Sequence, residues 1–135
     1  MARVVLFVFL LATLVAASWL PLAQCAERVT CYNSGRKFTR ARIINAINSL
    51  CARYKGQTFA DGRKVDQRYD FPSPETGHID ISAEAFRGCS FTMDENDCGR
   101  LLRRPTDECN TGGENGKQGG FVEDECRRFK MDPNA

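Results

Sequence analysis

Residues 39–56, TRARIINAINSLCARYKG, are the stretch that decides the fold. Apolar side chains recur there at the spacing of one face of an α-helix, and polar or cationic side chains fill the other face. Thr39 suits the N-cap position, and Lys55 followed by Gly56 suits the end of the helix. The apolar stripe consists of Ile43, Ile44, Ile47, Leu50, Cys51 and Tyr54. We expect a sheet to pack against this stripe.

Two segments downstream alternate between apolar and polar residues, as half-buried strands do. They are Val65–Phe71 and Ile79–Ala85, and segment 72–77, which contains prolines and a glycine, turns the chain between them. The pair is typical of an antiparallel hairpin with one solvent-exposed face. A shorter β-prone segment, Arg28–Tyr32, precedes the helix. The exposed face should carry Lys64, Asp66, Arg68, Asp70, His78, Asp80, Ser82 and Glu84.

The last third of the chain contains a second helix signal. Acidic and N-capping residues at Asp94–Asp97 favour a helix start, and Pro105 should kink or end that helix. Segment 110–120, NTGGENGKQGG, has five glycines and must be a loop. Glu125–Asp132 alternates like a last strand. The buried face of the second helix would carry Cys98, Leu101, Leu102 and Pro105.

The predicted order is therefore β-α-β-β-α-β. This order is typical of an α+β protein in which two helices cover one side of an antiparallel sheet. The apolar stripe of the first helix and the inner faces of the two longer strands would form the core. We predict a disulfide-stabilised two-layer α/β sandwich.

The chain begins with MARVVLFVFLLATLVAASWLPLAQCA, which is typical of a secretory signal peptide. Arg3 precedes a long apolar run, and small residues follow Pro21. The alternative is a transmembrane anchor, because the run is near the lower length limit for spanning a bilayer. Its position at the extreme N-terminus favours the signal peptide. We expect cleavage near residues 25/26, with 27–135 as a single small cysteine-rich domain.

Cysteine parity supports that cleavage site. Removal of the leader after Cys25 or Ala26 leaves six of the seven cysteines, an even number that suits three disulfides in an oxidising compartment. Six cysteines allow 15 pairings, and the sequence does not choose among them. We expect an extracellular protein without stable membrane insertion. The six cysteines are Cys31, Cys51, Cys89, Cys98, Cys109 and Cys126.

The charge balance excludes one class of partner. The chain has a net charge of +2, which falls to +1 when Arg3 leaves with the leader. A dedicated nucleic-acid-binding protein would show a strong excess of Lys and Arg. We therefore expect no nucleic-acid partner.

The sequence gives little support to an enzyme. A ribonuclease-like site would need two acid–base groups and a cation, and His78, Glu84 and Arg87 supply only part of that set because the chain has one histidine. No G-x-S-x-G motif is present, and the cysteines lack the C-x-x-C spacing of zinc sites. Carboxylates on the hairpin could form a glycosidase pair, but a solvated strand face gives the same pattern. We expect no catalytic site, no cofactor and no metal.

Loop 110–120 is the best candidate for ligand binding from composition alone. Its glycines allow close backbone approach, and Asn115, Lys117 and Gln118 supply polar groups. It lacks the complete phosphate-binding pattern G-x-x-x-x-G-K-[ST]. A connector that binds no ligand is the alternative.

Several landmarks occur together along nearly the whole mature chain. Cys31-Tyr32-Asn33-Ser34-Gly35 follows the leader, Asp97-Cys98 opens the second helix, Cys109 closes it, and Met131-Asp132-Pro133-Asn134 ends the last strand. Their order resembles that of small secreted fungal cysteine-rich proteins with the glycan-binding protein Y3-like domain. The resemblance implies a disulfide-held α/β sandwich of lectin-like or effector type.

The resemblance implies a binding function without chemistry. The expected protein recognises a glycan or a host surface component outside the cell, as effector or virulence proteins do. Its ligand-binding residues would be Tyr32 and Tyr69 together with Asn115, Lys117 and Gln118. Two other functions stay open, namely an effector that inhibits a host protein such as a protease, and a small secreted ribonuclease-like hydrolase. An exposed final strand would also allow a homodimer through edge-to-edge pairing.

Overall fold

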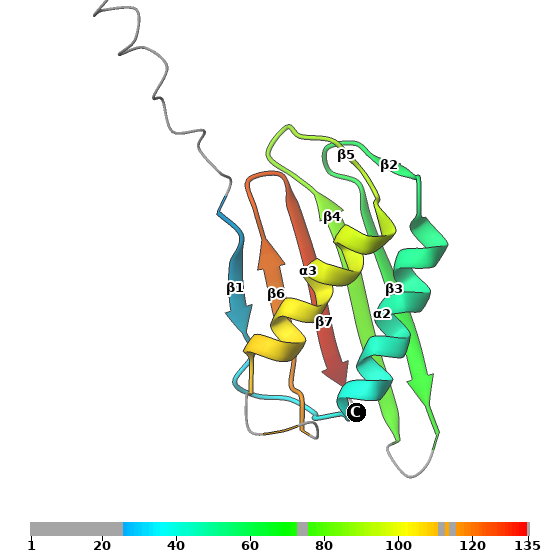
Figure 1. Cartoon of the computed structure of the whole chain (residues 1–135), viewed down its shortest axis with the longest axis vertical. Coiled ribbons are helices and arrows are strands. Elements are labelled where there is room, and N and C mark those ends of the chain that lie inside the picture. The colour runs from blue at the N-terminus through cyan, green and yellow to red at the C-terminus, as the bar shows by residue number, and fades with distance from the viewer. Residues whose placement is uncertain (1–25, 73–75, 111–112, 114–115, 135) are drawn as a thin grey trace, which may run out of the picture.

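The helix predicted at residues 39–56 forms as α2, Arg40–Tyr54. Thr39 occupies the N-cap position, and Gly56 adopts a φ of +74° just beyond the helix end. The computed structural model describes residues 26–72, 76–110, 113 and 116–134. Figure 1 shows α2 and a second helix, α3, lying side by side over one face of a sheet. The predicted two-layer α+β architecture is confirmed.

The main sheet has five strands, and all its neighbouring strands are antiparallel. Inner-face partners such as Ile81 and Met131, or Val122 and Phe129, lie directly opposite each other. A separate two-stranded sheet pairs β2, Thr58–Phe59, with β5, Phe91–Thr92. In spatial order the main sheet contains β1 (Arg28–Cys31), β6 (Gly120–Glu123), β7 (Arg127–Asn134), β4 (Gly77–Ala85) and β3 (Lys64–Phe71).

The order of elements is richer than predicted. The structure adds β6 and the small β2–β5 pair to the expected β-α-β-β-α-β series. β6 begins at Gly120, the last residue of the predicted glycine-rich loop, and only Phe121 and Val122 within it are apolar. Four residues give too short an alternation to be distinguished from a loop. The expected strands at 28–32, 65–71, 79–85 and 125–132 all form, with bounds shifted by a few residues.

The expectation of an exposed edge on the final strand is wrong. β7 lies between β6 and β4 and pairs with both, so it is not an edge strand. Because β6 lies between β1 and β7, β7 is the central strand of the sheet. The two edges of the sheet are β1 and β3.

The second helix, α3, runs from Glu95 to Glu108 and does not end at Pro105. Asp94 caps it, because the Asp97 amide donates to Asp94 Oδ1 at 2.8 Å. Pro105 lies on the buried face, where packing outweighs the loss of one backbone hydrogen bond. The next residue, Thr106, is also buried, and its hydroxyl donates to the Leu102 carbonyl at 3.2 Å.

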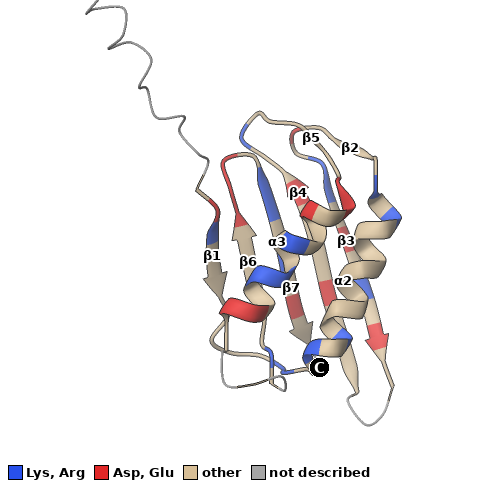
Figure 2. Cartoon of the chain, viewed as in Figure 1, with Lys and Arg blue, Asp and Glu red and all other residues tan. Residues whose placement is uncertain are grey.

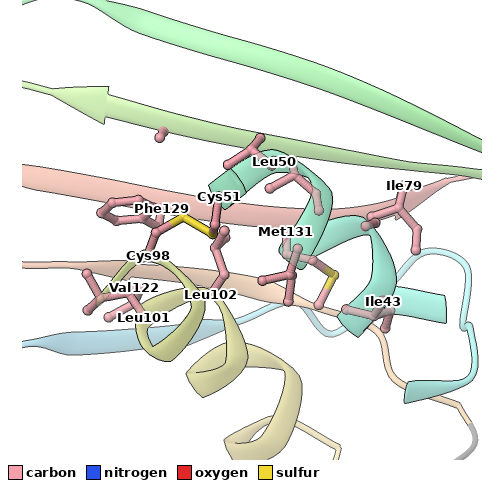
Figure 3. Close-up of a cluster of buried hydrophobic side chains, with 14 of the residues drawn as sticks. Ile43, Leu50, Cys51, Ile79, Cys98, Leu101, Leu102, Val122, Phe129 and Met131 are labelled. Atoms are coloured by element: carbon pink, nitrogen blue, oxygen red, sulfur yellow. A yellow bond between two sulfur atoms is a disulfide. The ribbon is translucent and has the colours of Figure 1, made fainter. Parts of the chain in front are cut away.

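The core lies between the two helices and the inner face of the sheet, as predicted for α2 and β4. Figure 3 shows Ile43 and Leu50 from α2 directed toward the strands that carry Ile79 and Phe129. The inner face of β3 contributes less, because its apolar side chains are only partly buried. Fully buried large side chains include Phe38, Phe59, Phe129, Ile43, Ile47, Leu50, Ile79, Ile81, Leu101, Leu102 and Met131.

All six cysteines that we expected in the mature chain form disulfides. Cys31–Cys109 joins the end of β1 to the C-cap of α3, and Cys51–Cys98 joins the two helices. Cys89–Cys126 joins the segment after β4 to the turn between β6 and β7. Three disulfides in so short a chain indicate an oxidising, extracellular environment.

The expected signal peptide occupies residues 1–26, and all of these except Ala26 lie outside the described residues. Within the described ranges, no helix is long and apolar enough to cross a membrane.

An ion-pair network attaches the N-terminal end of β1 to α3. The carboxylate of Glu27 accepts hydrogen bonds from Arg100 at 2.6 and 2.8 Å and from Arg104 at 2.9 Å. Asp97 then links Arg100 to Arg127. Hydrogen bonds from Arg100 lower the pKa of Glu27 from 4.5 to about 2, with Arg104 adding to the effect and partial burial opposing it.

Replacing Cys51 and Cys98 by alanine should lower the free energy of unfolding by about 2–5 kcal/mol, because the cross-link between the helices constrains the unfolded chain. Urea denaturation of the double variant and the wild type measures the difference. A free-thiol count of zero in the variant would verify that the other four cysteines still pair. An unchanged unfolding midpoint would contradict a stabilising role for this bond.

Glu27→Gln should lower the free energy of unfolding by about 1 kcal/mol at pH 7, as expected for solvent-screened ion pairs. The folded-state pKa of Glu27 is depressed, so its contribution is complete above about pH 4.5 and is lost as the pH falls toward 2. Urea midpoints of both proteins, measured at pH 7, 4 and 3, should therefore converge with acidification. A difference that does not vary with pH would contradict the assignment.

Candidate functional site

Both helices lie over one face of the main sheet (Figure 1), and among the described residues no helix covers the other face, here called the outer face. The alternation of β3 and β4 assigns to it the eight polar residues predicted for the exposed side, from Lys64 to Glu84. The strand register adds alternate residues of β7, β6 and β1. Among them are Arg28, Thr30, Phe121, Glu123, Arg128, Lys130, Asp132 and Asn134.

A hollow of about 340 Å³ opens on this face between the end of β1 and the second half of β7. We call it the Tyr32 hollow. One wall is the turn that follows β1, and the other is formed by outer-face side chains of β7. Its lining residues are Cys31, Tyr32, Asn33, Ser34, Gly35, Lys130, Asp132 and Asn134.

The turn that forms one wall is held from beneath by the segment before β6. The Tyr32 amide donates to the Gly119 carbonyl at 3.1 Å, and Gln118 Nε2 donates to the Gly35 carbonyl at 3.4 Å. Gly119 has a φ of +87°, and a Cβ there would overlap the Met131 carbonyl oxygen. Only glycine therefore fits where the chain passes this close to β7.

The charged pair in the hollow is Lys130 and Asp132, whose Nζ and Oδ2 atoms lie 2.9 Å apart. The hydrogen bond from Lys130 to this carboxylate holds the pKa of the ammonium above its ordinary value. Lys130 Nζ also lies 5.6 Å from the centroid of the Tyr32 ring, a cation–π distance. Burial raises the pKa of Tyr32, and the ammonium opposes that shift. The phenol is therefore neutral at pH 7.

Uncommitted polar groups complete the lining. Within the described part of the chain, the side chains of Asn33 and Ser34 form no hydrogen bond, and both residues are exposed. The Asn134 amide nitrogen donates to Asp80 Oδ2 at 3.2 Å and to the Asp132 carbonyl at 3.1 Å, which leaves its oxygen as an acceptor. The Tyr32 ring and several hydrogen-bond donors and acceptors thus line the same hollow.

Cations and aromatic rings alternate beside the hollow. The Tyr32 and Phe121 ring centroids are 6.5 Å apart. The guanidinium of Arg128 lies 5.3 Å from the Phe121 ring centroid and 5.2 Å from that of Phe86. Arg128 is also paired with Glu123 at 2.8 Å. The Tyr32 ring thus lies beside both Phe121 and the ammonium of Lys130. The net charge around it is small, because Arg128 is paired with Glu123 and Lys130 with Asp132.

The predicted ligand-binding residues occupy separate places. Tyr32 lines the hollow, whereas Tyr69 lies on the inner face of β3, at the opposite edge of the sheet. Lys117 and Gln118 are only 5% and 7% exposed, so neither presents its side chain at the surface. Gln118 holds the Gly35 carbonyl in the wall of the hollow, and Lys117 Nζ donates to the Asn110 carbonyl at 3.3 Å. Asn115 lies outside the described residues.

Sequence reasoning missed Lys130, Asp132 and Asn134. The alternation of the last strand could have indicated them. Phe129 and Met131 point inward, so Lys130, Asp132 and Asn134, at the alternate positions, must point outward. The alternation could not show that only β6 separates β7 from β1 in the sheet.

Of the groups considered for a ribonuclease-like site, His78 and Glu84 lie on the outer face of β4, six residues apart, whereas Arg87 lies in the segment that follows this strand. His78 Nε2 lies 3.3 Å from Asp80 Oδ2, and Arg68 donates to Asp80 at 3.0 Å. Burial would raise the pKa of Asp80, but the hydrogen bond and charge of Arg68 outweigh it and hold that pKa below its ordinary value. Among the residues the structure describes, no group of three or more His, Cys, Asp or Glu could hold a metal ion.

Comparison with known proteins gives no assignment for this chain. No protein-family model matches it, and no curated protein matches its sequence. The hollow is therefore interpreted from its own chemistry.

Gly119→Ala should destabilise the protein by about 2 kcal/mol or more, since the new Cβ meets both an unfavourable φ and the Met131 carbonyl. Gly88→Ala is the matched control, because Gly88 has a φ of +76° but open space around it, and it should cost about 1 kcal/mol. Chemical denaturation measures both losses. Equal losses would contradict the close approach of this segment to β7.

Proposed function

We propose that this protein is secreted and binds a glycan in the Tyr32 hollow without catalysing a reaction. The observation that carries the proposal is the convergence of a tyrosine ring with donors and acceptors of several kinds on one exposed hollow. Sugars present an apolar ring face and many hydroxyl groups. An aromatic side chain beside amide, hydroxyl and carboxylate groups is complementary to both features.

The charge of the hollow favours an uncharged sugar. Lys130 and Asp132 neutralise each other, and Arg128 is paired with Glu123. A strongly anionic or cationic ligand would have to displace one of these pairs. A neutral saccharide can accept from Lys130 and donate to Asp132 while the pair stays intact.

The rigidity of the wall supports a binding function. The disulfide Cys31–Cys109 ends β1 where the turn begins, and the buried Gln118 side chain holds the Gly35 carbonyl. A site whose groups are fixed before the ligand arrives loses less conformational entropy on binding.

Export from the cell is part of the proposal. Three disulfides suit an oxidising compartment, and the apolar N-terminal leader has the composition of a signal peptide. The resemblance of the sequence to fungal effector-type and lectin-like proteins supports action on a host or extracellular glycan.

A glycan-array screen followed by titration of the best neutral ligand tests the proposal. We expect saturable binding that Tyr32→Ala weakens about tenfold or more and that Tyr32→Phe weakens less, because the ring contributes more than the hydroxyl. Asn33→Ala should weaken binding too. The matched control Asn45→Ala, on the exposed side of α2, should leave it unchanged.

Two results would overturn the proposal. The folded protein could bind no glycan on the array, or Tyr32→Ala could bind as tightly as the wild type. Host proteins that co-purify with the protein and are not displaced by sugar would instead support the alternative of an inhibitor of a host protein.

A further inference from the structure

β3 is an open edge of the main sheet. Its eight residues pair with β4 on one side only. The Ala85 amide donates to the Arg63 carbonyl at 3.0 Å, and antiparallel pairs alternate between exchanging hydrogen bonds and not exchanging them. By this alternation, the residues whose backbone N–H and C=O groups face the open edge are Lys64, Asp66, Arg68 and Asp70.

The side chains of these four residues all lie on the outer face, and their charges alternate in sign along the strand (Figure 2). An antiparallel copy of the same strand, centred on Gln67, would place Lys64 opposite Asp70 and Asp66 opposite Arg68. The two-fold symmetry repeats both pairs. Every charged residue of the edge then faces an opposite charge.

We propose that β3 pairs antiparallel with β3 of a second copy of this chain, with Gln67 opposite Gln67 on the two-fold axis. The same register serves the inner face, where Val65 lies opposite the partner's Tyr69. Both side chains are only partly buried in the single chain, although they pack against its core. Pairing covers this apolar surface and joins the two sheets into one.

The charges select this register over its neighbours. A shift of two residues in one direction places Asp66 opposite Asp66 and Lys64 opposite Arg68. A shift in the other direction places Arg68 opposite Arg68 and Asp66 opposite Asp70, and parallel pairing sets like charge against like throughout. A shift of one residue turns the apolar face of one copy toward solvent. A shift of four residues again pairs opposite charges, Lys64 with Asp66 or Arg68 with Asp70, but it leaves much of the strand unpaired. The charges and the length of strand that pairs therefore together favour the register centred on Gln67.

Among the described residues, the backbone groups along the open edge of β3 pair with no other strand. α2 reaches β3 only on the inner face, where Arg53 Nη1 donates to Gln67 Oε1 at 2.8 Å and the Arg42 guanidinium lies 5.3 Å from the Phe71 ring centroid. Arg68 already donates to Asp80 at 3.0 Å and would lie between that carboxylate and the partner's Asp66. Gln67 Nε2 donates to the Arg68 carbonyl at 3.3 Å, a bond that the amide of the partner's Asp66 would replace. The other edge, β1, has only four residues.

Sedimentation equilibrium over protein concentrations from about 10 μM to about 1 mM tests the proposal. We expect a monomer–dimer equilibrium that weakens at high salt, because the exposed charge pairs are screened. Asp70→Lys and Lys64→Asp should each raise the dissociation constant about tenfold or more, since each sets like charges opposite one another twice in the dimer. Neither exposed position contributes to the core.

The double variant Lys64→Asp/Asp70→Lys restores opposite charges and should return the dissociation constant to within about threefold of the wild type. The control Lys37→Asp changes the net charge as Lys64→Asp does, at an exposed position away from β3, and should have no effect. A monomer at every concentration would overturn the proposal. A dimer insensitive to the single reversals, or a double variant no better than the singles, would overturn it as well.

Discussion

The packing of the α2 stripe against the inner face of β4 and against α3 is the contact on which the other features depend. It buries Ile43, Ile47 and Leu50 and so decides which face of the sheet is covered. The opposite face is then left to polar residues, and the Tyr32 hollow can exist only there. Because α2 also carries Cys51, the same packing brings this thiol to Cys98 on α3. One apolar stripe thus determines the core, one cross-link and the accessible surface.

Local periodicity was sufficient to predict the elements that are long and bury only one face. α2, β3 and β4 have clear periods of 3.6 or 2 residues, and their existence and faces were predictable. β6 was not, because its four residues, which begin with Gly120, are too few to show a period. α3 continues through Pro105 since burial of that ring compensates for a lost backbone bond. This compensation depends on tertiary packing, which the sequence does not display.

The site was predictable only in part for a related reason. Tyr32 stands in a recognisable motif, but its neighbours Lys130, Asp132 and Asn134 follow about a hundred residues later in the chain. Only the position of β6 between β1 and β7 brings them near. Composition also suggested that Lys117 and Gln118 were surface donors. Their burial shows that a polar residue in a glycine-rich segment can serve as internal support, because its hydrogen-bonding groups are satisfied by backbone atoms.

The order of the disulfides has a consequence for how the molecule is made. Cys31 pairs with Cys109, Cys51 with Cys98, and Cys89 with Cys126, so no cross-link joins cysteines that are consecutive in the chain. Synthesis proceeds from the N-terminus, so Cys31 and Cys51 are the first two of these six cysteines to be made. They are not native partners, because Cys31 pairs with Cys109 and Cys51 with Cys98. Productive oxidation must wait until the helices dock, or an isomerase must reshuffle early bonds. The correct pairing of the six cysteines thus requires either folding before oxidation or later exchange of early disulfides.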